Sequence, residues 1–241
     1  AMPQASPAAP GTPAATAATA RPAATVVILR DGERGIEALL VCRNTELAFA
    51  GGNWVFPGGR VEESDHAHAG ADADDVAAAR HAAVREAAEE TGVALDPGSL
   101  VWFAHWTPPA TAARRFTTHF FATAAPDPHV GVTVDGSEIH DWGWMTAADA
   151  LARRDRGEIL LRPATWITLH QLHGFETVAH ALEALERAEP EHYETHLADG
   201  APVPTALYEG DAGWDTADPD APGPRHRLVM AETSWTYLRH D

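Results

Sequence analysis

The first part of the chain alternates between apolar, β-branched stretches and turn residues, which is the pattern of consecutive β-strands. Residues 25–29 read Thr-Val-Val-Ile-Leu, an Asp-Gly turn signal stands at 31–32, and residues 38–42 form a second apolar stretch. Residues 53–55 predict a short strand that a proline and two glycines end. The pattern therefore predicts two strands joined by a turn, followed by a third, short strand.

Residues 74–91 carry the strongest helix signal in the sequence. Asp74 or Asp75 caps the start, alanine fills the interior, and Gly92 stands where a C-terminal cap belongs. The pattern predicts one long helix after the first three strands.

The remaining pattern predicts further strands and helices on both sides of a sheet. We expect strands at 101–104, 116–123, 139–145 and 228–230, and helices at 146–154 and 163–187, the second interrupted near Gly174. The chain beyond residue 189 is rich in turn residues and contains only the last of these strands. This order suits an α/β fold in which a mixed sheet packs between helices.

The first 24 residues differ in composition from the rest of the chain. They are dominated by Ala, Pro and Thr and have no periodic apolar face, so we expect a disordered leader. They also lack a charged start followed by a compact apolar stretch, so we do not expect secretion and predict a cytoplasmic protein. No apolar run approaches the roughly 18–20 residues that a membrane-spanning helix needs.

The charge balance narrows the classes of partner. The chain has 35 Asp and Glu residues against 17 Lys and Arg, a net charge of −18, and all 17 cations are arginine. Nucleic acids and anionic membranes are recognised by basic surfaces, so we expect neither as a partner. The single cysteine, Cys42, excludes an intrachain disulfide framework.

The helix at 74–91 also carries the clearest chemical signal. Glu86, Glu89 and Glu90 are spaced i, i+3 and i+4, so their carboxylates share one face of the helix. Three like charges repel one another unless a cation neutralises them, and carboxylate oxygens without His or Cys favour Mg²⁺, with Mn²⁺ as a second candidate. The alternative interpretation is a solvated acidic helix face.

The surrounding residues resemble the signature of the Nudix hydrolases, which is Gly, five residues, Glu, seven residues, then Arg-Glu-apolar-any-Glu-Glu-any-Gly-apolar. Residues 56–59 read Phe-Pro-Gly-Gly, and residues 85–93 match the second half without a gap. The first half departs from it, because Asp65 replaces the first Glu and 19 residues, not seven, separate Asp65 from Arg85. We expect the 12 extra residues, around 66–77, to form a surface loop and the approach to the helix.

An expanded signature of this kind, together with the Trp-Val-Phe-Pro-Gly-Gly of residues 54–59, resembles the Nudix subgroup that contains the peroxisomal coenzyme A diphosphatases. Further resemblances to that subgroup lie at residues 106–108, 114–116, 120–121 and 162–165.

The resemblance implies the α/β/α sandwich of Nudix proteins and a role for each site residue. Glu86, Glu89 and Glu90 would bind Mg²⁺ together with the carbonyl of Gly59, and Arg85 would brace these carboxylates. Among the other predicted site residues, Gly58 lets the backbone approach the substrate, and Arg43, Arg114 and Arg115 are candidates for phosphate contacts, of which Arg115 is favoured. Trp106 is a candidate for stacking on a base, and either Glu138 or Glu90 is the general base.

We therefore expect an Mg²⁺-dependent hydrolase that cleaves the diphosphate of a nucleoside diphosphate linked to another moiety. Coenzyme A or acyl-coenzyme A is the favoured substrate, and ADP-ribose, NADH or a nucleoside triphosphate are alternatives. A second class of function is a nucleotide-sensing Nudix module without catalysis. We expect three segments, a leader at 1–24, a Nudix domain at 25–162 and a helical and turn-rich extension at 163–241 packed on that domain, with the extension a candidate for a homodimer interface.

Overall fold

The computed structural model describes residues 20–44, 52–70, 73–134 and 136–240. Most of the predicted leader and all of residues 45–51 lie outside the described residues. No helix in the described ranges is long and apolar enough to cross a membrane.

The centre of the molecule is a mixed sheet, which has nine strands in the described part of the chain. Its main order is β8-β3-β2-β1-β6-β5-β9, with β4 also paired to β1 and β7 to β2. The strands are β1 (Arg21–Gly32), β2 (Gly35–Arg43), β3 (Asn53–Val55), β4 (Gly58–Arg60), β5 (Val101–Thr107), β6 (Phe116–Ala124), β7 (Ile139–Thr146), β8 (Leu160–Leu161) and β9 (Glu191–Glu194). Because β1 pairs with β6 in parallel and with β2 in antiparallel orientation, the prediction of a mixed sheet is confirmed.

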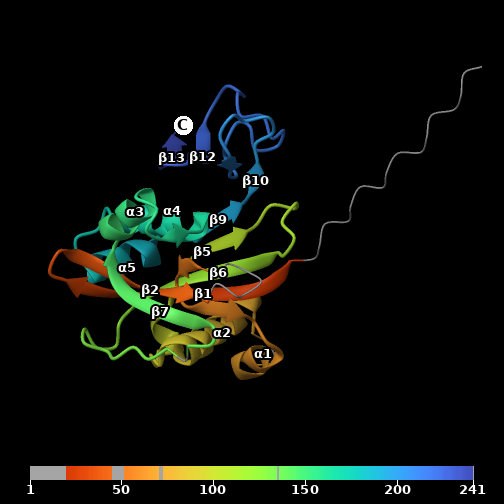
Figure 1. Cartoon of the computed structure of the whole chain (residues 1–241). Coiled ribbons are helices and arrows are strands. Elements are labelled where there is room, and N and C mark those ends of the chain that lie inside the picture. Colours follow the sequence, from red (N-terminus) through yellow and green to blue (C-terminus); the bar gives the residue numbers. More distant parts are fainter. Residues whose placement is uncertain (1–19, 45–51, 71–72, 135, 241) are drawn as a thin grey trace, which may run out of the picture.

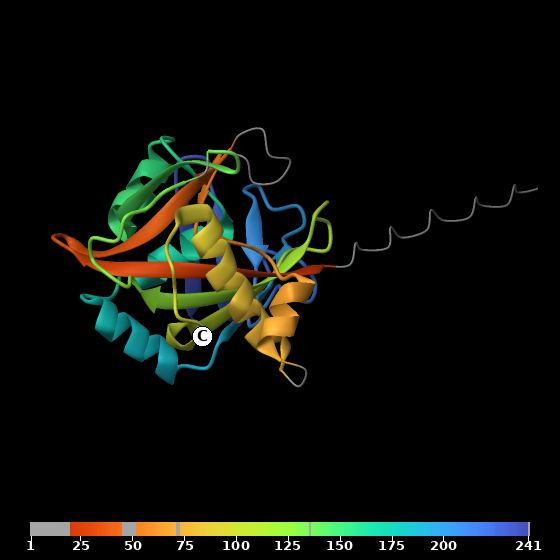
Figure 2. The same ribbon diagram turned by 90° about the horizontal axis from the view of Figure 1, so that it is seen from below.

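Helices cover both faces of this sheet (Figure 1). The helices are α1 (Glu63–Ala69), α2 (Asp75–Thr91), α3 (Ala147–Asp155), α4 (Pro163–Leu172) and α5 (Val178–Arg187), and a short 3₁₀ helix spans Pro97–Ser99. Seen from below, α2 crosses the sheet beside β1, with α1 next to it (Figure 2), while α3, α4 and α5 lie on the opposite face. The α/β/α sandwich and the break in the predicted helix near Gly174 are both confirmed.

Small side chains let α2 lie close to the sheet. The buried face of the helix carries Ala79, Ala82, Ala83 and Ala87, which belong to one core cluster with Val26, Ile28 and Phe121. With hardly any side-chain volume between helix and strands, the polar face of α2 is held at a fixed distance from β4 and β1.

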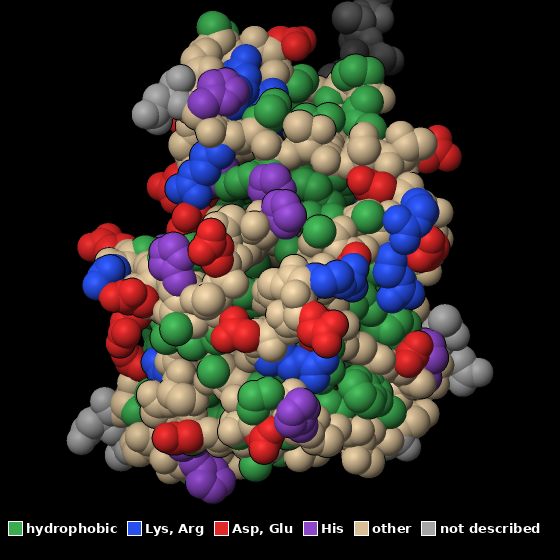
Figure 3. Space-filling model, turned by 90° about the vertical axis from the view of Figure 1, so that its left-hand side faces the viewer, with side chains coloured by type: hydrophobic (Ala, Val, Ile, Leu, Met, Phe, Trp, Pro, Cys, Tyr) green, Lys and Arg blue, Asp and Glu red, His purple; other side chains and the backbone are tan. Residues whose placement is uncertain are grey.

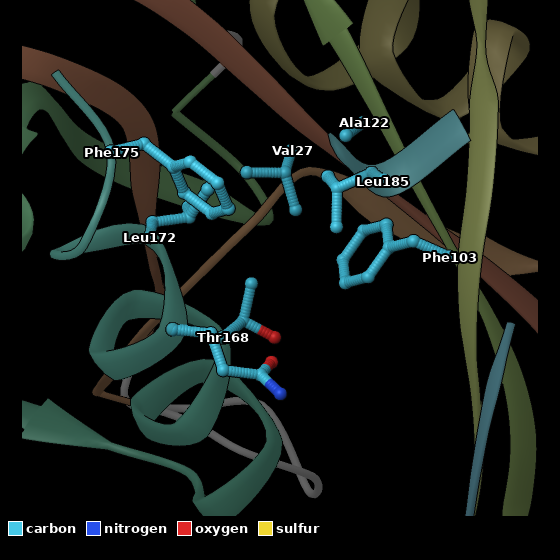
Figure 4. Close-up of a pocket in the computed structure, with 8 residues that line it drawn as sticks. Val27, Phe103, Ala122, Thr168, Leu172, Phe175 and Leu185 are labelled. Carbon is cyan, nitrogen blue, oxygen red and sulfur yellow. The ribbon is translucent and has the colours of Figure 1, made fainter. Parts of the chain in front are cut away.

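The opposite face holds the larger core, between the sheet and α4 and α5. Figure 4 shows Val27 and Phe103 of the sheet facing Leu172 of α4 and Leu185 of α5. They surround a cavity of about 20 Å³, which is room for one water molecule and too small for a substrate.

The C-terminal part of the chain forms a second sheet, where the sequence predicts turns and a single strand. Its strands are β10 (His196–Leu197), β11 (Thr205–Leu207), β12 (Arg225–Met230) and β13 (Trp235–His240), antiparallel in that order. Tyr208 and Leu228 from this region belong to the same core cluster as Trp106 and Tyr193 of the main sheet. The strand predicted at 228–230 lies within β12, whereas the sequence pattern does not predict β10, β11 and β13.

Two boundaries also differ from the sequence-based expectation. Residues 21–24, predicted to belong to the leader, are part of strand β1, because they pair with β6 and residues 23 and 24 also pair with β4. Residues 66–77, predicted to form a surface loop and the approach to the helix, instead include residues 66–69 of α1, which packs beside α2, and the first turn of α2.

Candidate active site

Helix α2 carries the three glutamates of the signature on the side that faces β4. Its ends are as predicted, since Asp74 accepts a hydrogen bond from Ala77 N at 2.9 Å and Gly92 adopts a left-handed conformation with φ 71°. The exposure of the three carboxylates differs greatly: Glu90 is 6% exposed, the Glu86 side chain 16% and the Glu89 side chain 58%. The helix therefore presents one buried, one partly buried and one exposed carboxylate.

The two glycines of β4 lie directly against these side chains. The N–H of Gly58 donates a hydrogen bond to Glu90 Oε2 at 3.0 Å. A Cβ atom added at Gly59 would lie 2.2 Å from Glu86 Oε1, so only glycine allows this approach. The contacts explain why a Gly-Gly pair at the start of β4 goes with glutamates on α2.

Arg85 joins two of the glutamates to the expanded part of the signature. Its guanidinium lies 2.9 Å from Glu86 Oε1 and 3.0 Å from Glu89 Oε2, and it also donates to both carboxylate oxygens of Asp65, at 3.2 and 3.0 Å. A further bond reaches the carbonyl of Arg60 at 2.9 Å. The guanidinium thus holds the acidic face of α2 in place through its ion pairs.

Asp65 stands at the position of the first glutamate of the signature, and the sequence leaves its role open. It is only 2% exposed and accepts a hydrogen bond from the Glu62 N–H at 2.9 Å, at the start of α1. Burial raises the pKa of Asp65, but hydrogen bonds from Arg85 and Glu62 outweigh that effect and leave the pKa below its usual value. Asp65 therefore stays ionised and anchors Arg85, although 19 residues separate the two in the chain.

A second arginine, Arg43 at the end of β2, lies on the other side of Glu90. Its guanidinium is 3.6 Å from Glu90 Oε1 and 3.5 Å from Glu138 Oε2, and the Glu138 side chain is 60% exposed. The predicted residues Arg43, Glu90 and Glu138 are thus brought together, with Glu138 at the rim.

The two arginines of the site do not fully compensate the burial and mutual repulsion of its carboxylates. Burial raises the pKa of Glu90 to about 7, and Glu86 and Glu138 add to this against the opposing effects of Gly58 and Arg43. Burial also raises the pKa of Glu86, and the nearby Glu89 and Glu138 contribute in the same direction. A divalent cation next to these carboxylates would favour their ionised forms.

The donor set fits a hard divalent cation in its chemistry, because it consists of carboxylate oxygens and a backbone carbonyl. In the described residues, however, no three His, Cys, Asp or Glu side chains already surround a single point that a metal ion would occupy. Glu86 and Glu89 instead turn toward Arg85. Binding a metal would require these flexible carboxylates to rotate away from the guanidinium.

Two other predicted site residues lie away from the glutamates. Arg115 precedes β6, which β1 separates from β4, and it donates a hydrogen bond to the carbonyl of Pro108 at 3.3 Å. Trp106, predicted to be available for base stacking, is 7% exposed and stacks on Tyr193 with 3.9 Å between ring centroids. The prediction for Trp106 is wrong because a tyrosine of the later strand β9 already covers its face.

Comparisons with known proteins agree with this site. The model of the NUDIX domain family matches residues 19–166, more than half of the chain. The chain therefore belongs to the NUDIX family and is a Nudix diphosphate hydrolase. Members of this family generally use divalent metals such as Mg²⁺.

One solved structure supports the same fold, and a second is similar to a smaller degree. A NUDIX hydrolase from Alicyclobacillus acidocaldarius is 27% identical with a TM-score of 0.64, over 71% of this chain and 99% of that one. A MutT NUDIX hydrolase from Burkholderia pseudomallei is 22% identical with a TM-score of 0.47, over 64% of this chain and 98% of that one. The comparison with curated proteins gave no match.

Proposed function

We propose that this hydrolase uses Mg²⁺ to cleave the diphosphate that links a nucleoside to another moiety, with coenzyme A or an acyl derivative as the favoured substrate. The observation that carries the proposal is the contact of Glu90 with Gly58 and of Glu86 with Gly59 of β4, with Glu89 on the same helix and joined to Glu86 through Arg85. Mn²⁺ has the same preference for oxygen ligands and is a second candidate metal.

Each residue of the site has a distinct task in this proposal. Glu86, Glu89, Glu90 and the Gly59 carbonyl would hold the metal, which polarises the diphosphate and lowers the pKa of the attacking water. Arg85, anchored by Asp65, keeps the carboxylates of Glu86 and Glu89 near β4.

We assign Glu138 as the general base, with Glu90 as the alternative. Glu138 is largely exposed at the rim, within reach of Arg43, so it can accept a proton from a water and release it to solvent. Glu90 is buried and held by Gly58, which suits a metal ligand better than a group that exchanges protons with water.

The test of the metal site is substitution of the glutamates one at a time. We expect Glu89→Gln and Glu90→Gln each to reduce Mg²⁺-dependent turnover by about 100-fold or more, while the circular dichroism spectrum stays unchanged. Glu183→Gln is the matched control, because Glu183 forms an i,i+4 ion pair with Arg187 on α5 as Glu89 does with Arg85 on α2. Full activity in either site variant would contradict the proposal.

The test of the general base separates turnover from metal binding. We expect Glu138→Gln to lower kcat while the Mg²⁺ concentration for half-maximal activity stays within about twofold of wild type. A shifted metal requirement with unchanged kcat would instead make Glu138 a metal ligand.

The preference for coenzyme A rests on the expanded signature and on residues 54–59, and a substrate panel tests it. Coenzyme A, ADP-ribose, NADH and nucleoside triphosphates would be incubated with enzyme and Mg²⁺, and the products identified by mass. We expect 4′-phosphopantetheine and adenosine 3′,5′-bisphosphate from coenzyme A. Cleavage of ADP-ribose alone would rule out the preference.

A further inference from the structure

Trp142, on β7, differs from the other large aromatic residues in its exposure. Among the Trp, Phe and Tyr residues that the structure describes, it alone is exposed, to 37%. On the face seen in Figure 3, acidic and basic side chains lie beside one another. Because single exposed hydrophobic residues are common on such a surface, the surroundings of Trp142 decide what its exposure means.

The ring of Trp142 is also uncovered. Each of the other seven tryptophans has an aromatic ring or an arginine guanidinium packed against it. Trp144, two residues further along β7, packs against the core cluster of α2 and has the Arg30 guanidinium 4.4 Å from its ring centre. In the part of the chain that the structure describes, no ring or guanidinium lies on Trp142 in this way. Its indole is therefore available to a planar ring from outside the protein.

Trp142 points to the same face of the sheet as the glutamates of α2. Its strand partner is Val41 of β2, two residues before Arg43. Paired residues share a face of a sheet, as do residues two apart on one strand. The Arg43 guanidinium lies 3.6 Å from Glu90 Oε1, and Trp144 packs in the core beneath α2, so this is the face that α2 covers.

An apolar row connects Trp142 with the strand that leads to the site glycines. Val41 pairs with Trp142 on one side and with Val55 of β3 on the other, so the three side chains lie in line across three strands. Arg43 and Trp142 are diagonal neighbours, which places their Cβ atoms about 7–8 Å apart. A nucleotide with a phosphate at Arg43 would therefore have the indole within reach of its base.

We propose that Trp142 is the surface on which the base of the substrate stacks, and that it selects nucleotides over diphosphates without a base. Every base has a π-face that can stack on an aromatic ring, so this contact recognises the presence of a base and not its identity. The inference rests on the proposed function for the position of the diphosphate. It gives Trp142 the role that the sequence assigns to the buried Trp106.

A binding experiment tests this role without relying on hydrolysis. AMP and ribose 5-phosphate differ by the base alone, and calorimetry in MgCl₂ would measure the affinity of each. We expect wild type to bind AMP about tenfold more tightly, as one base stacked on one aromatic side chain is enough to produce. Trp142→Ala should bind both compounds with equal affinity, and its affinity for ribose 5-phosphate should be that of wild type.

Two further substitutions separate stacking from apolar contact. Trp142→Phe keeps a flat aromatic ring and should retain most of the preference for AMP, whereas Trp142→Leu is apolar but not flat and should lose it. Leu197→Ala is the control, because Leu197 is 47% exposed on β10 of the second sheet, and it should keep the tenfold preference.

Since Trp142 is exposed, its variants should unfold at the urea concentration of wild type, which separates a lost preference from a lost fold. Equal affinities in wild type, no binding of either compound, or a preference that persists in Trp142→Ala or Trp142→Leu would each overturn the proposal.

Hydrolysis of coenzyme A separates this proposal from the proposed function. We expect Trp142→Ala to lower kcat/KM about tenfold, mainly through KM, because the base is held equally in the ground state and the transition state. A preference for AMP that depends on Trp142, without cleavage of coenzyme A, would remove the proposed substrate and leave the role of Trp142 standing. Cleavage of coenzyme A with equal kcat/KM in wild type and Trp142→Ala would remove that role and leave the diphosphatase activity standing.

Discussion

The adjacent glycines of β4 meet different neighbours, which allows activity and stability to be separated by single substitutions. A Cβ atom at Gly59 would meet the end of the flexible Glu86 side chain, 2.2 Å away, whereas one at Gly58 would meet the backbone carbonyl of Ala24 at 2.3 Å. A side chain can rotate away, but a backbone inside a sheet cannot.

We expect Gly59→Ala to lower kcat by about 100-fold, because it displaces Glu86, while the free energy of unfolding changes little. Gly58→Ala should instead lower the free energy of unfolding by about 1–3 kcal/mol through the backbone clash. Steady-state kinetics and urea unfolding of both variants check this contrast. A fully active Gly59→Ala enzyme would show that the position of Glu86 is unimportant.

His119 of β6, which lies near Asp74 and Asp75 at the start of α2, predicts how the free energy of unfolding depends on pH. Burial, and next the neighbouring His105, lower the pKa of His119 to about 4, against smaller opposing effects of Asp75 and Asp74. Histidine in the unfolded chain has a pKa of about 6.5, so between pH 4 and 6.5 only the unfolded chain takes up this proton. The contribution of His119 therefore makes the free energy of unfolding rise with pH over this window and level off above it.

We expect His119→Phe, which keeps the ring contact with His105 and Trp102, to reduce this rise between pH 4.5 and 6.5. Urea unfolding at several pH values checks it, and His66→Phe on the exposed side of α1 serves as control. An identical pH profile for wild type and His119→Phe would contradict the assigned pKa.

At the scale of elements, the sequence predicts those whose signals are local. Helix α2 has its N-cap, its C-cap glycine and its glutamates within one segment, so both its limits and its chemistry are visible without the rest of the fold. Helix α1 is not predicted, because Asp65, which fixes its start, gains its partner Arg85 only when the two helices pack together.

The second sheet and the burial of Trp106 could not be predicted from the sequence, because neither leaves a local signal. Strands β10 and β11 have only two and three residues, too short for any alternation to appear. Trp106 has the sequence context of an accessible aromatic residue, and only the distant Tyr193 makes it part of the core. Contacts between segments far apart in the chain decide these features, and no pattern within a short segment records them.

A buried ion pair holds the second sheet to its connecting loop. The Asp211 side chain is 0% exposed and the Arg227 side chain 8% exposed, and Asp211 Oδ1 lies 2.6 Å from Arg227 Nη2. Asp211 also accepts hydrogen bonds from the backbone N–H groups of Gly213 and His226. We expect Asp211→Ala to lower the free energy of unfolding by about 3 kcal/mol, because it leaves Arg227 buried without its partner. Urea unfolding measures the change, and Asp215→Ala in the same loop, where the residue is exposed, should be nearly neutral.

At the scale of the whole molecule, the net charge of −18 repels anionic substrates and attracts metal cations. An anion approaching this protein is repelled at long range, so attraction has to come from a bound cation and from the arginines beside the glutamates, Arg43 and Arg85. The absence of lysine leaves arginine and backbone N–H groups as the phosphate ligands that the chain itself supplies.

A bound cation should therefore also stabilise the folded state. At ten times its dissociation constant, Mg²⁺ would add about 1.4 kcal/mol to the free energy of unfolding, which corresponds to a rise in Tm of about 3–5 °C. Thermal unfolding in MgCl₂ and in NaCl of equal ionic strength measures this difference. The rise should be absent from Glu89→Gln/Glu90→Gln, and a rise that persists there would place the metal elsewhere.

The parallel pairing of β5 with β9 also has a consequence for synthesis on the ribosome. Ala104 pairs with Glu191, so the outer edge of β5 gains its neighbour only after synthesis has passed residue 191. Until then a nascent chain exposes unpaired backbone groups at that edge and leaves Trp106 without Tyr193. The nascent chain is therefore open to aggregation through this edge until β9 has been made.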